Sequence, residues 1–490
     1  MQNPFQVDQR DLLSQFWKEH PAAPILKKLA AEVPKLYLVG GFVRDALRGE
    51  LSHDVDLEVY GVLVEKLETL LNQLFPGQIH SVGKAFGIFR IPAGSGFVDI
   101  ALPRRESKSG SGHKGFVVEG DPNMTVEEAT RRRDFTVNAM LIDVKDGTLV
   151  DPFGGKKDLD EKRLRVVDPK TFVDDPLRVY RAIQLAARLD FAVEPKSFEL
   201  MHSMVARGDL ATLSKERVTD EIRKLILMAE KPSIGWTLAR ELGIIERDYP
   251  ELQALIGTKQ EPEWHPEGDV WVHSLMVIDE AARIIRDSAR SFSEREAYSV
   301  VLGSFCHDLG KPATTQVIDG RIRSRGHEEA GIIPTKSLLA RWTFSSEILH
   351  NCVIAASEHL KPGMLYREHE KGAITDAQYR NGVRRLIRRT HPTPWRVLLA
   401  VAEADWRGRG IPGTRDPNEP YEYGKRFRET VSDLEAHQDL LPLLEGRDLL
   451  ALGIEPGPRV GELLREVETA RDNGDVKTRD EAIVWIKTRI

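Results

Sequence analysis

The front part of the chain alternates short apolar runs with glycine, proline and one helical stretch. The runs LYLV, VDLEVY, GIFRI and FVDIAL begin between residues 36 and 100, and strand-like signals return at AMLIDV before DPFGG. Short runs of this kind, bounded by turn residues, are typical of β-strands. The pattern therefore predicts a mixed α/β unit.

From about residue 174 the pattern becomes helical. PLRVYRAIQLAARLDF, VTDEIRKLILMA and VWVHSLMVIDEAARII place apolar residues three and four positions apart, which predicts successive amphipathic helices. The polar stretches KQEPEWHPEG (259–268) and WRGRGIPGTRDPNEPY (406–421) predict a domain junction and a linker. We expect five parts: an extension at 1–35, an α/β head at 36–165, a helical neck and body at 166–258, a second helical domain at 259–425 and a helical tail at 426–490.

Length and composition narrow the class of protein. At 490 residues the chain is too long for one compact core. It has no apolar run that could span a bilayer, and its N-terminus lacks the pattern of a secretory signal. The two cysteines, Cys306 and Cys352, cannot form a disulfide framework and are predicted to be small buried hydrophobic residues. We expect a cytoplasmic protein with no membrane partner.

With a net charge of −6, the molecule as a whole lacks the excess of positive charge that is typical of nucleic-acid-binding proteins. Any RNA contact must therefore come from local basic patches, although such runs are more often solvated faces. The candidates are Arg104, Arg105, Lys108 and Lys114, then Arg131, Arg132 and Arg133, then Arg384, Arg385, Arg388 and Arg389. The first two groups gain weight because they lie beside the motifs described next.

The first motif joins a glycine pair to two carboxylates. In LVGGFVRDALRG a strand runs into Gly40 and Gly41, and a helix follows, which lets a ligand approach the backbone closely. Asp54 and Asp56 follow in HDVDLEVY. Residues i and i+2 of a strand share a face, so the two carboxylates converge, while Val55 and Leu57 turn toward the core. Such a pair repels unless a cation lies between its members, and Mg²⁺ prefers oxygen ligands and nucleotide phosphates.

This pattern resembles the nucleotidyltransferase superfamily that includes DNA polymerase β, and within it the class II tRNA nucleotidyltransferases and bacterial poly(A) polymerases. RRRDFTVNAM (131–140), DPFGGKKDL (151–159) and DDPLRVYRAIQLAARL (174–189) extend the match in the same order. The resemblance implies a polymerase β-like mixed sheet followed by an all-α neck and body. It also implies Asp54 and Asp56 as ligands of Mg²⁺, and nucleotide contacts from Gly40, Gly41, Arg44, Arg133 and Asp134, the last two at the ribose.

The same resemblance makes Asp175 and Arg178 a protein template that would pair with the incoming cytosine or adenine. A carboxylate accepts and a guanidinium donates in a fixed fork, which suits base edges. Arg181, on the same helical face, could buttress or stack. Asp175 before Pro176 could equally be a plain helix start, and the family usually has glutamate where this chain has Asp174.

Two further features of the front half each have two possible interpretations. Asp99 in FVDIALPRRE is either a third carboxylate near the metals or a polar strand position. The loop KSGSGHKG (108–115) matches the flexible segment of the family, which would move as specificity switches from C to A, and could also be a solvated linker.

A second constellation lies in the rear half. It consists of His273, His307, Asp308 and Asp405, with His327 and His359 in addition. Imidazole and carboxylate together suit a divalent transition metal, or Mg²⁺ when oxygen dominates. The set resembles the all-α HD phosphohydrolase superfamily, in which the first four residues would be the metal ligands. The other two would hold a second metal or bind phosphate, although His359 could also be an ordinary hydrogen-bonded helix residue.

An HD domain behind a class II nucleotidyltransferase resembles the bacterial multifunctional CCA proteins. The resemblance implies addition of C, C and A to the tRNA 3′ end from CTP and ATP, and removal of phosphates, including 2′,3′-cyclic ones, from RNA ends. Three alternatives stay open: a poly(A) polymerase, a partial enzyme adding only CC or only A, and an HD hydrolase with a non-catalytic RNA-binding front half. The residues before the first strand depart from the pattern of this family, and the sequence carries no signal for an oligomeric state.

Overall fold

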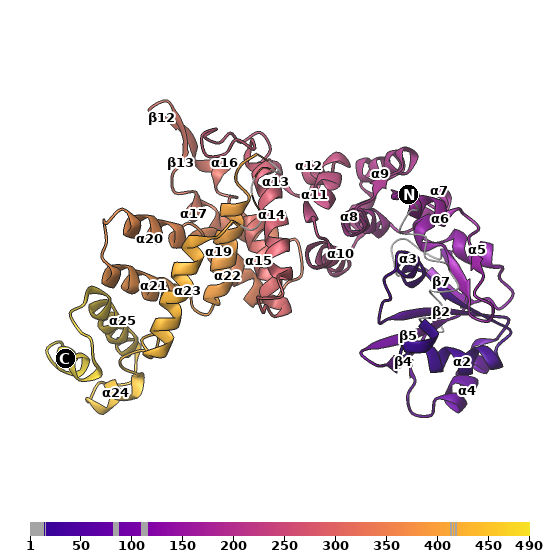
Figure 1. Cartoon of the computed structure of the whole chain (residues 1–490), viewed down its shortest axis with the longest axis horizontal. Helices are drawn as coiled ribbons and strands as arrows, with labels where there is room; N and C mark the ends of the chain where they lie inside the picture. Colours follow the sequence, from indigo (N-terminus) through magenta and orange to yellow (C-terminus); the bar gives the residue numbers. More distant parts are fainter. Residues whose placement is uncertain are drawn as a thin grey trace. The chain divides into compact units, whose positions relative to one another are not determined.

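The chain is described by a computed structural model that covers residues 14, 16–81, 88–108, 116–411, 414, 416 and 419–490. These residues form two compact units (Figure 1). Unit 1 comprises residues 1–229 and 234–247, and unit 2 comprises residues 230–233 and 248–490. The described helices include none that is long and apolar enough to cross a membrane.

The head is built on a seven-stranded mixed sheet with the strand order β3-β4-β5-β2-β1-β8-β9. The strands are β1 Lys35–Val39, β2 Val55–Tyr60, β3 His80–Ser81, β4 Phe89–Ala93, β5 Gly96–Ala101, β8 Leu141–Asp143 and β9 Leu149–Val150. Only β2 and β5 run parallel, while β1 pairs antiparallel with both β2 and β8. The predicted α/β head with a mixed sheet is confirmed.

Alternation of apolar and polar residues fixes which face of the central strand β2 is buried. Val55, Leu57 and Val59 are buried, while Asp56 points to the opposite, open face. Burial of such side chains stabilises the fold by roughly 1.5–3 kcal/mol each. A one-residue slip would expose all three, so the hydrophobic pattern also fixes where Asp56 points.

Helices and short strands complete unit 1. They are α2 Ala23–Glu32, α3 Gly41–Leu47, α4 Val64–Leu74, β6 Arg104–Lys108, β7 Phe116–Gly120, α5 Val126–Arg131, η3 Thr136–Asn138, α6 Gly155–Asp160, β10 Arg163–Leu164, α7 Pro169–Phe172, α8 Leu177–Leu189, β11 Ala192–Val193, α9 Pro195–Arg207, η4 Asp209–Thr212, α10 Lys215–Met228, α11 Pro232–Glu241 and α12 Ile244–Asp248. Helix α8 is buried along most of its length and packs on α10.

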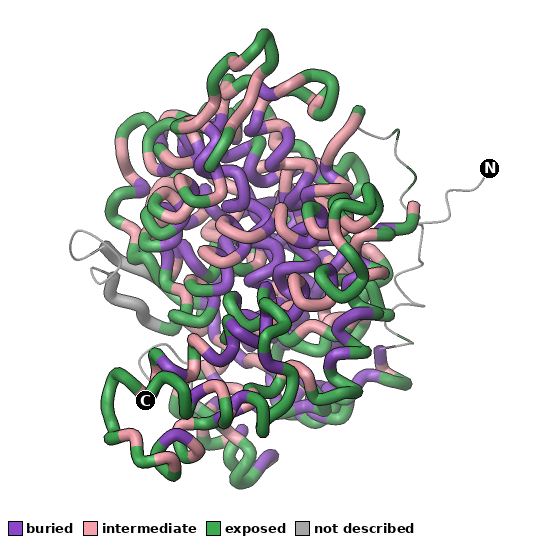
Figure 2. Tube along the Cα trace, turned by 90° about the vertical axis from the view of Figure 1, so that its left-hand side faces the viewer, coloured by how far each residue is buried: buried purple, intermediate pink, exposed green. Residues whose placement is uncertain are grey.

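Unit 2 is helical around a core of four helices, α14 Val270–Arg286, α15 Glu294–Cys306, α19 Ser346–Glu358 and α22 Trp395–Arg407, in which α15 and α22 each contact the other three. Buried positions of the chain are purple in Figure 2. The other helices are α13 Pro250–Gln253, α16 Lys311–Thr314, α17 His327–Ala330, α18 Ile332–Leu339, α20 Lys361–Glu370, α21 Asp376–Thr390, α23 Glu422–Ala436, α24 Gly446–Ala451, α25 Pro458–Asn473 and α26 Arg479–Lys487.

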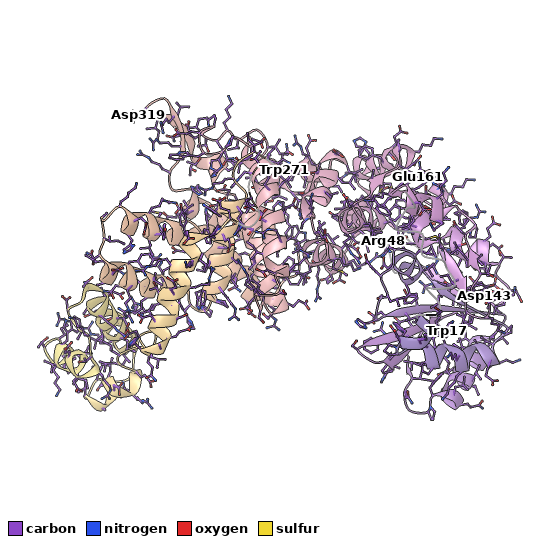
Figure 3. All side chains as sticks on the ribbon, in the orientation of Figure 1. Trp17, Arg48, Asp143, Glu161, Trp271 and Asp319 are labelled. Atoms are coloured by element: carbon purple, nitrogen blue, oxygen red, sulfur yellow. The ribbon has the colours of Figure 1, made fainter. Side chains whose placement is uncertain are left out.

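One antiparallel hairpin interrupts the helical pattern of unit 2. It is formed by β12 Thr315–Ile318 and β13 Arg321–Ser324, with Asp319 in the turn (Figure 3). The sequence pattern predicted only helices here, so the hairpin was not predicted. Each of its strands has only four residues, and such short strands give a weaker signal than the helical pattern around them.

The third basic patch has a structural partner. Arg384, Arg385 and Arg388 of α21 converge on Asp472 of α25, and Arg384 also pairs with Glu468. Arg384 is buried, so this part of the patch connects two helices of unit 2 instead of presenting a free basic face. The buried Cys306 and Cys352 are free thiols, as predicted.

Candidate active sites

The turn between β1 and α3 brings the backbone to the edge of an open cavity. Gly40 has φ 72°, a left-handed conformation that favours glycine. A Cβ atom added there would lie 3.0 Å from Nη1 of Arg133. The absence of a side chain at Gly40 therefore allows both the turn and the close packing of Arg133.

The carboxylates cluster where β2 and β5 run side by side. Asp56 lies opposite Asp99 in the parallel register, and Asp99 is held by Arg90 through two 2.7 Å hydrogen bonds. Asp54 lies one residue before β2, not within the strand as predicted, and its Oδ1 accepts a 3.0 Å hydrogen bond from the Phe97 amide. The strand begins only at Val55, where pairing with Val98 starts.

The surroundings of Asp56 disfavour its charged form. Desolvation raises the pKa of Asp56, and the neighbouring carboxylates of Asp99, Asp54 and Glu58 raise it further, against the opposing effect of Arg133. A divalent cation bound beside Asp56 would relieve this repulsion. Asp99 is thus close to the predicted metal ligands, with its own oxygens occupied by Arg90.

A cavity of about 380 Å³ gathers all of the predicted nucleotide-binding residues. Its lining includes every residue predicted to contact the nucleotide, together with Asp56; Asp54 is not part of the lining. The lining residues are Gly40, Gly41, Arg44, Asp56, Arg132, Arg133, Asp134, Asn138, Asp175, Leu177, Arg178, Arg181 and Arg217. Contacts to the nucleotide were not predicted for Arg132, Asn138, Leu177 and Arg217.

Most charged groups in this cavity already have protein partners. Arg44 is buried and donates to Asp45 and to Oδ1 of Asn138. Arg133 donates to Oε1 of Glu58 at 2.8 Å and to the carbonyl of Asn138. These contacts fix the guanidinium groups of Arg44 and Arg133 at the cavity wall.

Asp134 is a buried anchor. Its Oδ1 accepts from the Phe135 amide and from Asn138, and its Oδ2 pairs with Arg181 at 2.6 Å. Burial alone would raise the pKa of Asp134, but Arg181 and the hydrogen bonds lower it to about 2. Asp134 therefore stays charged and ties η3 to α8.

Asp175 and Arg178 lie together at the start of α8. Asp175 accepts from the Leu177 amide at 3.2 Å and from Arg217 at 3.0 Å, so it caps the helix and also faces the cavity. Arg178 donates to the carbonyls of Thr171 and Arg132 at 2.7 and 2.6 Å. Arg217 of α10 was missed because the sequence KERVTDEIRK does not show which of its charges points inward.

In unit 2 the predicted ligands come from five different elements. His273 lies on α14, His307 and Asp308 directly follow α15, and Asp405 lies on α22. His327 begins α17 and His359 directly follows α19. All six are buried.

Their ligand atoms converge on one centre. His273 Nε2 lies 3.2 Å from Asp405 Oδ1 and 3.3 Å from His307 Nε2, and His307 Nε2 lies 3.1 Å from Asp308 Oδ2. Nε2 of His327 and Oδ1 of Asp308 lie 3.4 Å apart, and neither atom has a hydrogen-bond partner among the described residues. Buried polar atoms without partners are costly unless an ion satisfies them. The donor set therefore fits a divalent metal.

The outer ring nitrogens of the histidines are held from behind. Nδ1 of His307, His327 and His359 lies 2.7, 2.8 and 3.1 Å from the carbonyls of Ser304, Ser324 and Ala356. In these contacts Nδ1 carries the ring proton and donates to the carbonyl. Nε2 is therefore unprotonated, and its lone pair is directed at the centre, as in metal-binding histidines. Burial and the neighbouring His307 lower the pKa of His359 to about 3, which keeps it neutral. These observations favour a metal or phosphate role for His359 over the role of an ordinary hydrogen-bonded helix residue.

Three comparisons with known proteins bear on these two sites. Residues 36–165 match the model of the poly A polymerase head domain, and residues 190–256 match that of a probable RNA and SrmB-binding site of polymerase A. A multifunctional CCA protein of Xanthomonas campestris pv. campestris (strain B100) is 35% identical over 440 residues, 89% of this chain and 97% of that protein.

The chain belongs to the multifunctional CCA protein family. Another member, from Stenotrophomonas maltophilia (strain R551-3), is 37% identical over 436 residues, 88% of this chain and 97% of its own. Among solved structures, a CCA-adding enzyme in its apo form has a TM-score of 0.63 at 22% identity and covers 98% of this chain and 97% of its own. The Thermotoga maritima CCA-adding enzyme complexed with tRNA has a TM-score of 0.57 at 21% identity, with coverages of 98% and 99%. The structural likeness confirms the fold, and the membership confirms the family that the motifs predicted.

Four residues of the CCA protein's second site were not predicted. Glu267 Oε1 lies 2.9 Å from Nδ1 of His273 and 2.8 Å from Nδ1 of His265, and so orients His273 as the carbonyls orient the other histidines. Lys311 Nζ lies 2.6 Å from Asp308, and Arg409 pairs with Asp405. His265 and Glu267 fall in the stretch interpreted as a domain junction, where polar residues and prolines hid their role.

Gly310 tests how tightly this site is packed. A Cβ atom there would lie 2.0 Å from the carbonyl oxygen of His327 and 2.5 Å from the amide of Gly331. Because both neighbours are backbone atoms, we expect Gly310→Ala to displace His327 and lower the free energy of unfolding by roughly 1–3 kcal/mol. Urea unfolding measures the change. Gly457→Ala is the control, since its Cβ would meet no atom within 4 Å, and equal stability of the two variants would contradict the expectation.

Proposed function

We propose that this chain completes the 3′ end of tRNA in the cytoplasm by adding C, C and A from CTP and ATP. The observation that carries the proposal is the single cavity that joins the Gly40–Gly41 turn, Asp56, Arg133 and the Asp175–Arg178 pair. The family membership supports it, because the relatives are multifunctional CCA proteins. Phosphate contacts to the acceptor stem would dominate the affinity for tRNA and make it sensitive to salt.

In this proposal Asp54 and Asp56 hold Mg²⁺ at the edge of β2. The ion would supply charge stabilisation for the attacking hydroxyl and the departing pyrophosphate. Gly40 and Gly41 leave room for the triphosphate because they carry no side chains, and Arg44 and Arg133 place positive charge on the cavity wall. Asp134 keeps Arg181 in place through their 2.6 Å ion pair, and its role at the ribose stays a prediction.

Asp175 and Arg178 would read the base edge as a template. For this, Arg178 must turn N–H groups now bonded to the carbonyls of Thr171 and Arg132 toward the nucleotide. Both oxygens of Asp175 accept from Arg217, and Oδ1 also accepts from the Leu177 amide, so Arg217 must release an oxygen of Asp175, or share it, when a base binds. Asp175 and Arg178 both line the cavity.

Arg178→Ala is expected to relax nucleotide choice more than it slows the reaction. A bidentate contact to a base edge is worth roughly 1–3 kcal/mol of discrimination, which is about a 5- to 150-fold change. The measurement is the ratio of kcat/KM for CTP to that for UTP. Arg207→Ala serves as the control, because Arg207 is an exposed helical arginine paired only with residues outside the cavity. An unchanged ratio in Arg178→Ala would remove Arg178 from the template.

A gel assay with tRNA lacking its 3′ CCA, Mg²⁺ and separate or combined CTP and ATP separates the possible products. Addition of two C residues and then one A, with both nucleotides required, is the expected result. Long A tails from ATP alone would identify a poly(A) polymerase. Addition of only C or only A would identify a partial enzyme, and no addition at all would leave unit 2 as the active part.

We propose a second activity, metal-dependent phosphohydrolysis at RNA ends, on the basis of the buried cluster in unit 2. His273, His307, Asp308 and Asp405 would hold the metal, with His327 and His359 on a second ion or on the substrate phosphate. The metal would supply a water of lowered pKa for attack on a phosphoester. Lys311 and Arg409 hold the carboxylates of Asp308 and Asp405 in place. Removal of a 3′ or 2′,3′-cyclic phosphate would produce the free hydroxyl that nucleotide addition needs.

A further inference from the structure

Residues 16–22, called here the N-terminal clamp, precede the region matched by the head-domain model, which begins at residue 36. Phe16 is buried and its ring stacks on that of His20, with ring centroids 4.7 Å apart. Both rings contact the edge of Phe42, at 5.7 and 6.0 Å. Phe42 belongs to α3, the helix that follows the Gly40–Gly41 turn and carries Arg44. The clamp therefore packs directly behind the turn at the nucleotide cavity.

His20 also holds the loop that leads to Asp54. Its Nδ1 accepts a 3.2 Å hydrogen bond from the amide of Ala22, so the ring proton lies on Nε2. Nε2 lies 2.9 Å from the carbonyl oxygen of Ser52 and therefore donates to it. The Ser52 hydroxyl in turn accepts from the Asp54 amide at 3.3 Å. A chain of two hydrogen bonds thus connects His20 to the backbone of a predicted metal ligand.

Through Pro21 the clamp packs on the β4–β5 turn, which in turn packs on the Asp54 loop. A Cβ atom at Gly94, in the turn between β4 and β5, would lie 2.8 Å from Pro21. The neighbouring Gly96 packs equally tightly on the carbonyl of His53, where a Cβ would lie 2.3 Å away. Because the Phe97 amide donates to Asp54, the β4–β5 turn and the Asp54 loop are packed as one layer beneath the clamp.

We propose that the N-terminal clamp positions the catalytic carboxylate Asp54, with His20 as the positioning residue. The proposal rests on the function proposed above for Asp54 and Asp56. Helix α2 anchors the segment to the head through its apolar face, on which Leu26 and Leu29 are buried. The donor of His20 and the rings of Phe16 and His20 lie outside that helix, and they contact the loop and the helix that border the nucleotide cavity.

The test compares three variants of the full chain. His20→Phe keeps a ring against Phe16 and Phe42 but has no donor for Ser52, whereas His20→Gln keeps an N–H donor of similar reach. His437→Phe is the matched control, because His437 is exposed, directly follows α23 of unit 2 and lies outside both matched regions. Each variant is measured for kcat and KM in nucleotide addition, for its thermal midpoint and for hydrogen–deuterium exchange of peptides covering residues 51–60 without Mg²⁺.

We expect His20→Phe to lower kcat by about tenfold to 100-fold, the usual effect of removing a residue that orients a ligand, with KM for CTP nearly unchanged. Exchange at residues 51–54 should become faster while the thermal midpoint stays close to that of the parent, and His20→Gln should recover most of both. Parent-like kcat and parent-like exchange in His20→Phe would overturn the proposal. So would a loss of kcat equal to that of His437→Phe, or a loss that accompanies general unfolding and is not recovered by His20→Gln. If the parent chain adds no nucleotide, the proposed function fails, and the exchange experiment still decides whether His20 holds the loop.

Discussion

Asp56→Asn is expected to lower the rate of nucleotide addition by roughly 10³-fold or more without weakening the fold. Loss of a metal ligand removes several kcal/mol of transition-state stabilisation, and each 1.36 kcal/mol corresponds to a factor of ten. The metal-free head should be no less stable than the parent, because Asp99, Asp54 and Glu58 already disfavour a charge at Asp56. An asparagine of the same size removes this repulsion. The thermal midpoint without Mg²⁺ should therefore stay the same or rise.

The matched control for this variant is Asp143→Asn. Asp143 lies on β8 of the same sheet (Figure 3), and its carboxylate accepts only from the amide of Lys145 in the following turn. Addition of nucleotide to tRNA lacking CCA should continue in this control at nearly the parent rate. Parent-like activity in Asp56→Asn would contradict the metal role of Asp56. A fall of activity together with the thermal midpoint would show a structural role instead.

The sequence was most informative where local pattern determines geometry. Alternation of apolar residues in VDLEVY predicted that Asp56 leaves the sheet on the face opposite Val55 and Leu57, and the burial of β2 agrees. The order of motifs predicted a family that the relatives confirm. The roles of the individual site residues stay predictions, and so does the five-part division of the chain.

Contacts between distant segments could not be predicted from local pattern. Arg217 reaches Asp175 from 42 positions away, and Glu267 reaches His273 from a proline-containing stretch without regular periodicity. The sequence pattern indicates which face of a helix is apolar, but it does not identify the partner of each charged residue on that helix. The Arg384 patch shows the same limit, since a basic run on a helix looks alike whether it faces solvent or, as here, Asp472.

Asp308→Asn is expected to abolish metal binding and hydrolysis in unit 2 while leaving nucleotide addition within about twofold of the parent, since the two sites lie in separate compact units. Although burial opposes its charge, His307 and Lys311 hold the pKa of Asp308 well below its usual range. The substitution therefore removes a charged ligand and also leaves the buried Lys311 without its 2.6 Å carboxylate partner. Breaking a buried ion pair from one side costs roughly 3–5 kcal/mol, so this variant should also be less stable.

The double variant Asp308→Asn/Lys311→Met separates the two effects. Methionine removes the unpaired buried charge, so the free energy of unfolding should return toward that of the parent. Metal binding and hydrolysis of a 2′,3′-cyclic phosphate RNA end should stay lost. Asp319→Asn in the turn of the β12–β13 hairpin is the control within the same unit. Metal content by elemental analysis is measured alongside activity. Hydrolysis that returns with stability in the double variant would mean that Asp308 supports the fold and not the metal, and the cluster of histidines would then have to act without it.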